Sequence, residues 1–255
     1  MTSTIFCYNK GGVTAFQSSK NRNLHSVICG APRETKHIAY PRFQRFLARR
    51  SLGVKGPTVF FVSTNILTNN NGFFPKNSPD FVRYQSEKLI LQGVLPRLNK
   101  TVVYKYYPSQ NYLYETHPFT DLLPAGSRTI ISGNEDFRYL RAGADIIVTS
   151  APTSTLGWAI GTRKPLVYLH SSKYNPVQDD YVTSAFRECF FFFDTSDSDW
   201  VSSLVEFLNQ PMVRIEELWK EMLHRQLTHE NYFLLGRTKN AGLIGADYVK
   251  KLARI

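Results

Sequence analysis

Three hydroxyl side chains stand next to one another at Thr153, Ser154 and Thr155, an arrangement that can hold an anion. They lie in a turn of small residues between an apolar segment at 145–149, predicted to be a strand, and a short apolar helix. The unpaired N–H groups and the dipole at the start of a helix attract negative charge. We expect a phosphate here, and specifically the diphosphate of a nucleotide-linked donor. Simple N-capping of the helix by the same hydroxyls is the alternative.

Two further candidates stand alone at the ends of other predicted strands. Lys105 closes an apolar segment at 101–105, where it would neutralise a phosphate, hold its loop near a nucleotide, or be an ordinary solvated lysine. His170 follows the apolar segment at 165–169 and would act as a general acid or a phosphate ligand, or be incidental. The six histidines form no HExxH pair, so we expect no metal site and no cofactor.

A third group of polar residues follows the predicted strand at 128–131. Ser132, Gly133 and Asn134 are candidates for contact with a nucleobase or ribose, because a glycine lets a flat ring approach the backbone closely. Asp136 is a candidate for the same contact. Its alternative role is to cap the short helix predicted at 135–141.

The elements that must position these residues form a regular pattern from residue 56 onward. Short apolar segments alternate with helical patterns, which predicts an α/β fold: a Rossmann-like parallel sheet with helices on both faces. In such a sheet, functional groups gather beyond the carboxyl ends of the strands. The predicted strands are 58–62, 101–105, 128–131, 145–149, 165–169 and 189–193, and the main predicted helices are 81–98, 198–208, 213–227 and 243–252.

Residues 1–53 differ from the rest of the chain. They contain short strand-like segments at 5–8 and 26–29 and a basic helical segment at 43–50, and we interpret them as an arm or an incomplete lobe. The domain from 54 to 255 would carry the sheet. Residues 1–50 hold nine lysines and arginines against one acid, Glu34, and the whole chain has a formal net charge of +11. This basic segment is expected to face solvent or an anionic membrane rather than nucleic acid, since no nucleic-acid-binding fold accompanies it.

Several classes of protein are excluded by what the sequence lacks. No apolar run approaches the roughly 20 residues of a membrane span, and the first 20 residues carry no signal-peptide core. The three cysteines are odd in number and widely spaced, which indicates a reducing cytosol. No GxGxxG, Walker or GxSxG motif occurs, which argues against P-loop proteins and α/β-hydrolases.

The residues singled out above also carry a family resemblance. The runs VVYKYYPS at 102–109, ADIIVTS at 144–150, TSTL at 153–156 and GTRKPLVY at 161–168 resemble the donor-binding half of GT-B glycosyltransferases. The nearest kind is that of bacterial surface-carbohydrate, capsule and teichoic-acid polymerases. The resemblance covers about residues 55–255 and includes the pair of acids before the helix at 135–141.

The resemblance implies a role for each matching residue. Lys105 and Pro108 would lie near the donor, the hydroxyls of 153–155 would hold its phosphates, and 132–136 would lie beside the base. Two departures concern the donor site: Tyr107 stands where many members have histidine, and Trp158 stands where many have a ribose-binding glutamate. A GT-B enzyme also needs an acceptor lobe that commonly supplies the catalytic base, and residues 1–53 are too short for a complete one.

The sequence therefore predicts a cytosolic, metal-independent transferase, with peripheral contact to the inner face of the membrane. It would bind a nucleotide sugar or nucleotide polyol and pass the sugar or polyol phosphate to a glycan acceptor of the cell surface. A partner subunit would supply the acceptor lobe if the chain lacks one. The alternatives are a non-catalytic nucleotide-sugar-binding or assembly module and, third, a nucleic-acid-binding protein.

Overall fold

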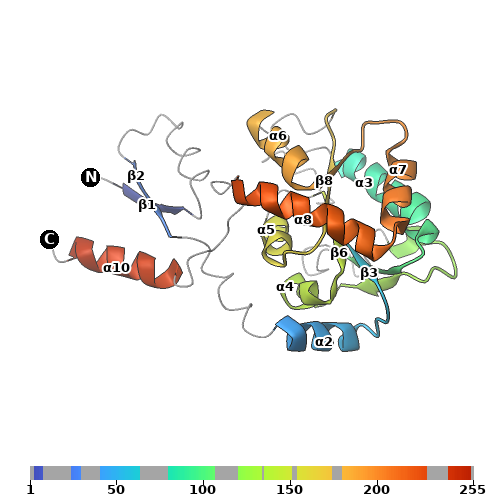
Figure 1. Cartoon of the computed structure of the whole chain (residues 1–255), viewed down its shortest axis with the longest axis horizontal. Coiled ribbons are helices and arrows are strands. Elements are labelled where there is room, and N and C mark those ends of the chain that lie inside the picture. The colour runs from blue at the N-terminus through green and yellow to red at the C-terminus, as the bar shows by residue number, and fades with distance from the viewer. Residues whose placement is uncertain are drawn as a thin grey trace. The chain divides into compact units, whose positions relative to one another are not determined.

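The structure is a computed structural model, and it describes residues 3–7, 24–29, 41–63, 80–106, 120–133, 135–150, 154–173, 180–228 and 241–253. The chain divides into two compact units (Figure 1). One comprises Met1–Pro41 with Leu223–Ile255, and the other comprises Arg42–Met222. The assignment of residues 1–53 to an acceptor-lobe remnant and of 54–255 to a donor domain stays a prediction.

The larger unit is built on a six-stranded, fully parallel sheet. The strands are near-continuously apolar, and β3 and β7 are buried along their whole length, as expected for a sheet covered by helices on both faces. The predicted α/β fold is confirmed. The strands are β3 (Thr58–Val62), β4 (Thr101–Lys105), β5 (Ile130–Ser132), β6 (Ile146–Thr149), β7 (Leu166–His170) and β8 (Phe191–Asp194), in the spatial order β5-β4-β3-β6-β7-β8.

The helices follow the predicted pattern with two differences. The helix predicted at 81–98 breaks into three parts, because a π-helical turn at Ile90–Val94 brings Gly93 against α7, where an added Cβ would lie 3.4 Å from Val201. Helix α6 was not predicted at all. The helices around the sheet are α2 (Pro41–Ser51), α3 (Asp80–Leu89), η1 (Ile90–Val94), η2 (Leu95–Arg97), η4 (Thr120–Leu122), α4 (Phe137–Leu140), η5 (Arg141–Gly143), α5 (Ser154–Gly161), α6 (Asp180–Cys189), α7 (Trp200–Asn209) and α8 (Met212–Thr228).

The smaller unit contains two parallel strands and one helix. Strands β1 (Ser3–Cys7) and β2 (Leu24–Ile28) pair in register, close to the segments predicted at 5–8 and 26–29. Tyr248 of α10 (Ala241–Ala253) packs on both strands: its ring stacks on His25 at 5.7 Å and meets the edge of Phe6 at 6.0 Å. Aromatic contacts thus join the two ends of the chain within this unit.

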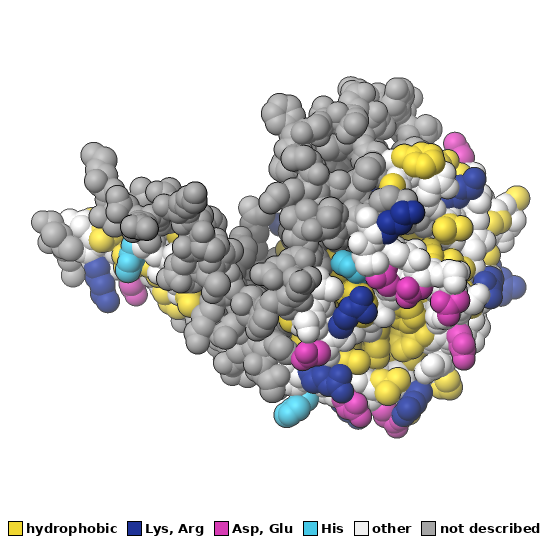
Figure 2. Space-filling view, turned by 90° about the horizontal axis from the view of Figure 1, so that it is seen from above, with side chains coloured by type: hydrophobic (Ala, Val, Ile, Leu, Met, Phe, Trp, Pro, Cys, Tyr) yellow, Lys and Arg dark blue, Asp and Glu magenta, His cyan; other side chains and the backbone are white. Residues whose placement is uncertain are grey.

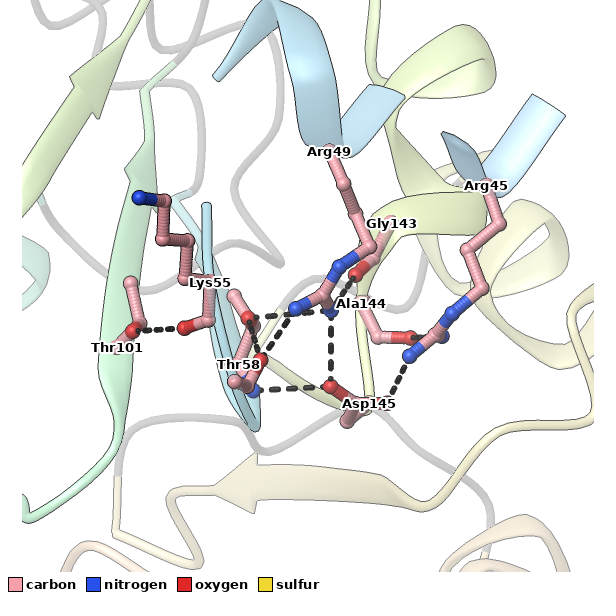
Figure 3. A network of polar contacts seen from close by, with 9 residues as sticks. Arg45, Arg49, Lys55, Thr58, Thr101, Gly143, Ala144 and Asp145 are labelled. Atoms are coloured by element: carbon pink, nitrogen blue, oxygen red, sulfur yellow. Dashed lines mark hydrogen bonds and ion pairs between the residues drawn. The ribbon is translucent and has the colours of Figure 1, made fainter. Parts of the chain in front are cut away.

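Helix α2 is fastened to the amino end of the sheet by a polar network (Figure 3). The carboxylate of Asp145, just before β6, accepts hydrogen bonds from Arg45 at 2.6 Å and from Arg49 at 3.2 Å. The same carboxylate accepts the backbone N–H of Thr58, the first residue of β3, at 3.0 Å. Arg49 also donates to the carbonyl of Gly143 at 3.2 Å. One acid therefore ties α2, β3 and β6 together at the rim opposite the carboxyl ends of the strands.

Candidate functional site

The strand order identifies where this sheet can bind a ligand. From β3 the chain moves outward to β4 and β5 on one side, and then crosses to β6, β7 and β8 on the other side. This is the order of dinucleotide-binding α/β sheets, in which the crevice opens beyond the carboxyl ends of the two central strands. Those ends are Ser63 after β3 and Ser150 after β6. The reversal of strand order therefore lies beside the start of α5.

The register brings the predicted site residues to this same rim. Val62 at the end of β3 pairs with Lys105 on one side and with Thr149 on the other. Lys105 in turn pairs with Ser132. Neighbouring strands lie about 4.8 Å apart, so the ends of β4, β3 and β6 form a row roughly 10 Å across. The predicted residues Lys105 and Ser132 therefore lie on the same edge of the sheet as the ends of β3 and β6.

Helix α5 begins at Ser154, directly beyond the switch point. Thr155 lies in its first turn and is half-buried, and Leu156 is buried below it. The helix start expected from the sequence is confirmed, and it opens at the rim that Lys105 and Gly133 share. Thr153 lies outside the described residues, so its role as a phosphate ligand stays a prediction, as do those of Ser154 and Thr155.

Lys105 is a buried cation that holds two strand ends together. It is only 3% exposed, and its Nζ donates to the carbonyl of Tyr106 at 2.6 Å and to that of Gly133 at 3.2 Å. Burial lowers the pKa of this ammonium group, while the nearby carboxylates of Glu135 and Asp136 act in the opposite direction. Of the roles considered for Lys105, this geometry supports holding the loop in place. Pro108, its expected companion, lies outside the described residues.

The aromatic ring of Tyr106 packs directly against the backbone of Gly133. A Cβ added at Gly133 would lie 1.9 Å from Cζ and Oη of Tyr106, so no other residue is accommodated while the ring stays there. The Lys105 ammonium lies 5.7 Å from the centre of the same ring. Tyr106, which was not a sequence candidate, therefore covers the end of β5. Contact of Gly133 with a nucleobase stays a prediction.

Replacing Gly133 with alanine is expected to lower the free energy of unfolding by about 1–2 kcal/mol, because the methyl group must displace the Tyr106 ring. Urea unfolding of Gly133→Ala, Tyr106→Ala and the double variant measures the coupling between the two positions. In the Tyr106→Ala background, the Gly133 substitution should cost almost nothing. Gly93→Ala is the matched control, since its Cβ makes only an ordinary contact. Additive costs at 133 and 106 would refute this packing.

The acids after β5 are engaged in local hydrogen bonds. Glu135 accepts from the hydroxyl of the buried Ser132 at 2.7 Å, and this bond is the main cause that lowers the pKa of Glu135. Asp136 is the N-cap of α4, and its carboxylate accepts a hydrogen bond from the backbone N–H of Arg138 at 2.8 Å. The carboxylate also forms an ion pair with the Arg138 guanidinium. The capping role foreseen for Asp136 is thus present. Asn134 lies outside the described residues.

His170 ends β7 as a buried imidazole. It is 5% exposed, and its Nδ1 atom has no hydrogen-bond partner among the described residues. Burial lowers the pKa of His170, and Arg187 lowers it further, while Asp194 partly opposes them. A lowered pKa disfavours the charged imidazolium form of this ring. This argues against general acid catalysis by His170, and its contact with a phosphate stays a prediction.

Glu87 is a site-proximal residue that the sequence reasoning missed. It is 3% exposed on α3, and it accepts the phenolic hydrogen of the buried Tyr104 at 2.7 Å. Ser63, at the end of β3, also bonds to this carboxyl group. Burial raises the pKa of Glu87 to about 7. The helical spacing could have indicated this burial. Glu87 is three residues before Ile90 and four before Leu91, so it lies on the same inward face of the helix.

The described part of the chain has neither a metal-binding cluster nor a membrane-spanning helix. Within it, no group of three or more His, Cys, Asp or Glu side chains is placed to hold a metal ion. No helix within it is long and apolar enough to cross a bilayer. Metal independence stays a prediction.

Comparison with solved structures identifies the fold. HepE of Anabaena, solved with UDP and glucose, aligns with a TM-score of 0.53 and 15% identity over 99% of this chain and 64% of HepE. WaaG, a glycosyltransferase involved in lipopolysaccharide biosynthesis, aligns with a TM-score of 0.51 and 16% identity over 94% of this chain and 62% of WaaG. The wall teichoic acid polymerase TagF aligns with a TM-score of 0.59 and 9% identity over 99% of this chain and 59% of TagF.

These likenesses confirm the expected GT-B glycosyltransferase fold. At identities of 16% or below they concern the fold alone. The chain spans less than two thirds of the length of each of these three structures. No protein-family model and no curated protein matches the sequence.

Proposed function

We propose that the chain binds a nucleotide-linked sugar or polyol in the cytosol and serves its transfer to a cell-surface glycan. One observation carries the proposal: the start of α5 opens at the point where the strand order reverses. Lys105 and Gly133 share that rim through the β-sheet register. HepE was solved with UDP-glucose, which gives the ligand class additional support.

The proposed chemistry is electrostatic. When a glycosyl or polyol-phosphate group leaves its nucleotide, negative charge builds up on the departing phosphates. The N–H groups at the start of α5 and the hydroxyl of Thr155 would stabilise that charge. Lys105 would keep the β4 and β5 loops in position by holding the Tyr106 and Gly133 carbonyls.

Isothermal titration calorimetry with UDP, CDP and GDP, and with their sugar or polyol conjugates, tests the binding step. We expect one of these series to bind, and Thr155→Ala to weaken that binding about tenfold, because a hydrogen bond to a charged oxygen is lost. Ser202→Ala is the matched control, since it removes an exposed hydroxyl from α7. The proposal fails if no nucleotide binds, or if Thr155→Ala binds as tightly as the control.

A second candidate function is nucleotide-sugar binding without turnover by this chain alone. It is favoured by the state of the described carboxylates at the rim. Glu135, Asp136 and Asp194 all accept hydrogen bonds from neighbouring groups, and none of these three is poised as a free base. Assays for release of the nucleoside diphosphate, with and without co-encoded proteins, separate the two candidates. Turnover by the isolated chain would exclude the binding module.

A further inference from the structure

Helix α2 packs on its unit through the side chains that usually face solvent. Arg45 donates to the carbonyl of Ala144 at 3.2 Å and to Asp145, and Arg49 lies in the same network (Figure 3). Between these arginines, Ala48 is 4% exposed, and an added Cβ on Gly143 would lie 3.2 Å from its methyl group. The inward face of α2 is therefore basic, small and firmly held.

The apolar side chains of α2 point away from the unit. Phe43, Phe46 and Leu47 are 60%, 56% and 47% exposed, at positions i, i+3 and i+4 of the helix. Arg50, at i+7, continues the same stripe and is also exposed. A surface helix ordinarily buries such a stripe against the core. We call these four residues the α2 outer face.

The charged side chains of α2 have one sign. Helix α2 contains no acidic residue, and the exposed Arg42 and Arg50 stand near its two ends. By contrast, the described part of the face seen in Figure 2 carries basic and acidic side chains interspersed. An apolar stripe on a helix whose charged residues are all basic complements a surface that is apolar inside and anionic outside.

We propose that the α2 outer face docks on an anionic lipid bilayer. The helix lies in the plane of the headgroups, with Phe43, Phe46 and Leu47 reaching the acyl boundary and Arg42 and Arg50 meeting lipid phosphates. The hydrogen bonds of Arg45 and Arg49 hold the opposite face of α2 against the unit, so the helix cannot rotate to bury its apolar stripe. Because α2 sits at the amino ends of β3 and β6, docking there leaves the carboxyl rim open to water. The inference does not depend on nucleotide binding.

Sedimentation of the full chain with vesicles tests this proposal. Vesicles of phosphatidylcholine mixed with phosphatidylglycerol are expected to bind the chain, and pure phosphatidylcholine vesicles are not. The Phe43→Ser, Phe46→Ser double variant should bind the mixed vesicles at least about tenfold more weakly, because two apolar side chains no longer enter the interface. Arg50→Gln should bind them about fivefold more weakly, and added salt should weaken the wild type.

Two controls match the changes in chemistry and leave α2 intact. Phe81→Ser removes a phenylalanine that is 70% exposed on α3, and Arg97→Gln removes an exposed cation of η2. Both are expected to bind vesicles as the wild type does. Equal binding to neutral and anionic vesicles, or equal losses in the α2 variants and the controls, would overturn the proposal. So would a concentration-dependent dimer in lipid-free ultracentrifugation that the α2 variants abolish, since the face would then join two copies of the chain.

Discussion

An Asp145→Ala variant is expected to lose about 3 kcal/mol of unfolding free energy. The carboxylate is 13% exposed at its side chain and holds Arg45, Arg49 and the backbone N–H of Thr58. Its removal leaves the Arg49 guanidinium without its counter-charge and the fully buried Thr58 without an acceptor at its N–H. Breaking a buried ion pair costs about 3–5 kcal/mol. We expect the lower value here, because the Arg45 side chain is 33% exposed and its ion pair is partly screened by water.

Urea unfolding at pH 7 measures this loss, and two further variants show its origin. Asp145→Asn keeps one acceptor for Thr58 but loses the charge, so its cost should fall between those of the wild type and Asp145→Ala. Asp197→Ala, which removes an exposed carboxylate after β8, should cost less than about 0.5 kcal/mol. If Asp145→Ala is as stable as Asp197→Ala, the network does not fasten α2.

Replacing Glu87 with glutamine is expected to stabilise the protein above pH 7 by up to about 3 kcal/mol. Burial raises the pKa of Glu87 from 4.5 to about 7, so between these values the folded chain keeps a proton that the unfolded chain releases. The stabilising effect of that proton is complete below the unfolded pKa and is lost as pH rises to about 7. Glutamine does not titrate and can still accept the Tyr104 hydroxyl, so it escapes this loss.

Unfolding free energies measured in urea from pH 5 to pH 8 provide the test. The stability of the wild type should fall relative to that of Glu87→Gln across this range, and the difference should be smallest at its acidic end. Glu206→Gln, at an exposed position of α7, should follow the wild type at every pH. Parallel curves for Glu87→Gln and the wild type would show that Glu87 ionises in the folded state much as it does in the unfolded chain.

The strands could be predicted because their burial on both faces leaves a continuous apolar run, as in β3 and β7. Helix α6 was missed because its inward residues, Ala185, Phe186 and Cys189, merge with the phenylalanines of β8. When a helix runs directly into a strand, their apolar residues form one continuous stretch. The spacing of those residues then does not show where the helix ends and the strand begins.

The candidate site could be predicted only as a set of strand ends. Which ends lie side by side depends on strand order, and the alternating pattern alone does not fix that order. The bond from Lys105 to the carbonyl of Gly133 joins residues 28 positions apart and follows from the pairing of β4 with β5. Capping by Asp136 was foreseen because it depends on residues two positions away. Hydrogen bonds between residues close in the sequence could thus be predicted, whereas contacts that depend on strand pairing could not.

Strand β8 has a consequence for the behaviour of the protein at high concentration. Among the described residues it is the last strand of the sheet, so one row of its backbone groups has no neighbouring strand there. A run of four phenylalanines, at 190–193, overlaps this strand. The guanidinium of Arg187 lies 4.3 Å from the centre of the Phe192 ring and 3.7 Å from the Asp194 carboxylate. Of the two side chains, Arg187 is 54% exposed, so a further strand added here would have to displace or desolvate its guanidinium. We therefore expect the Arg187 charge to disfavour extension of the sheet by another molecule at high protein concentration.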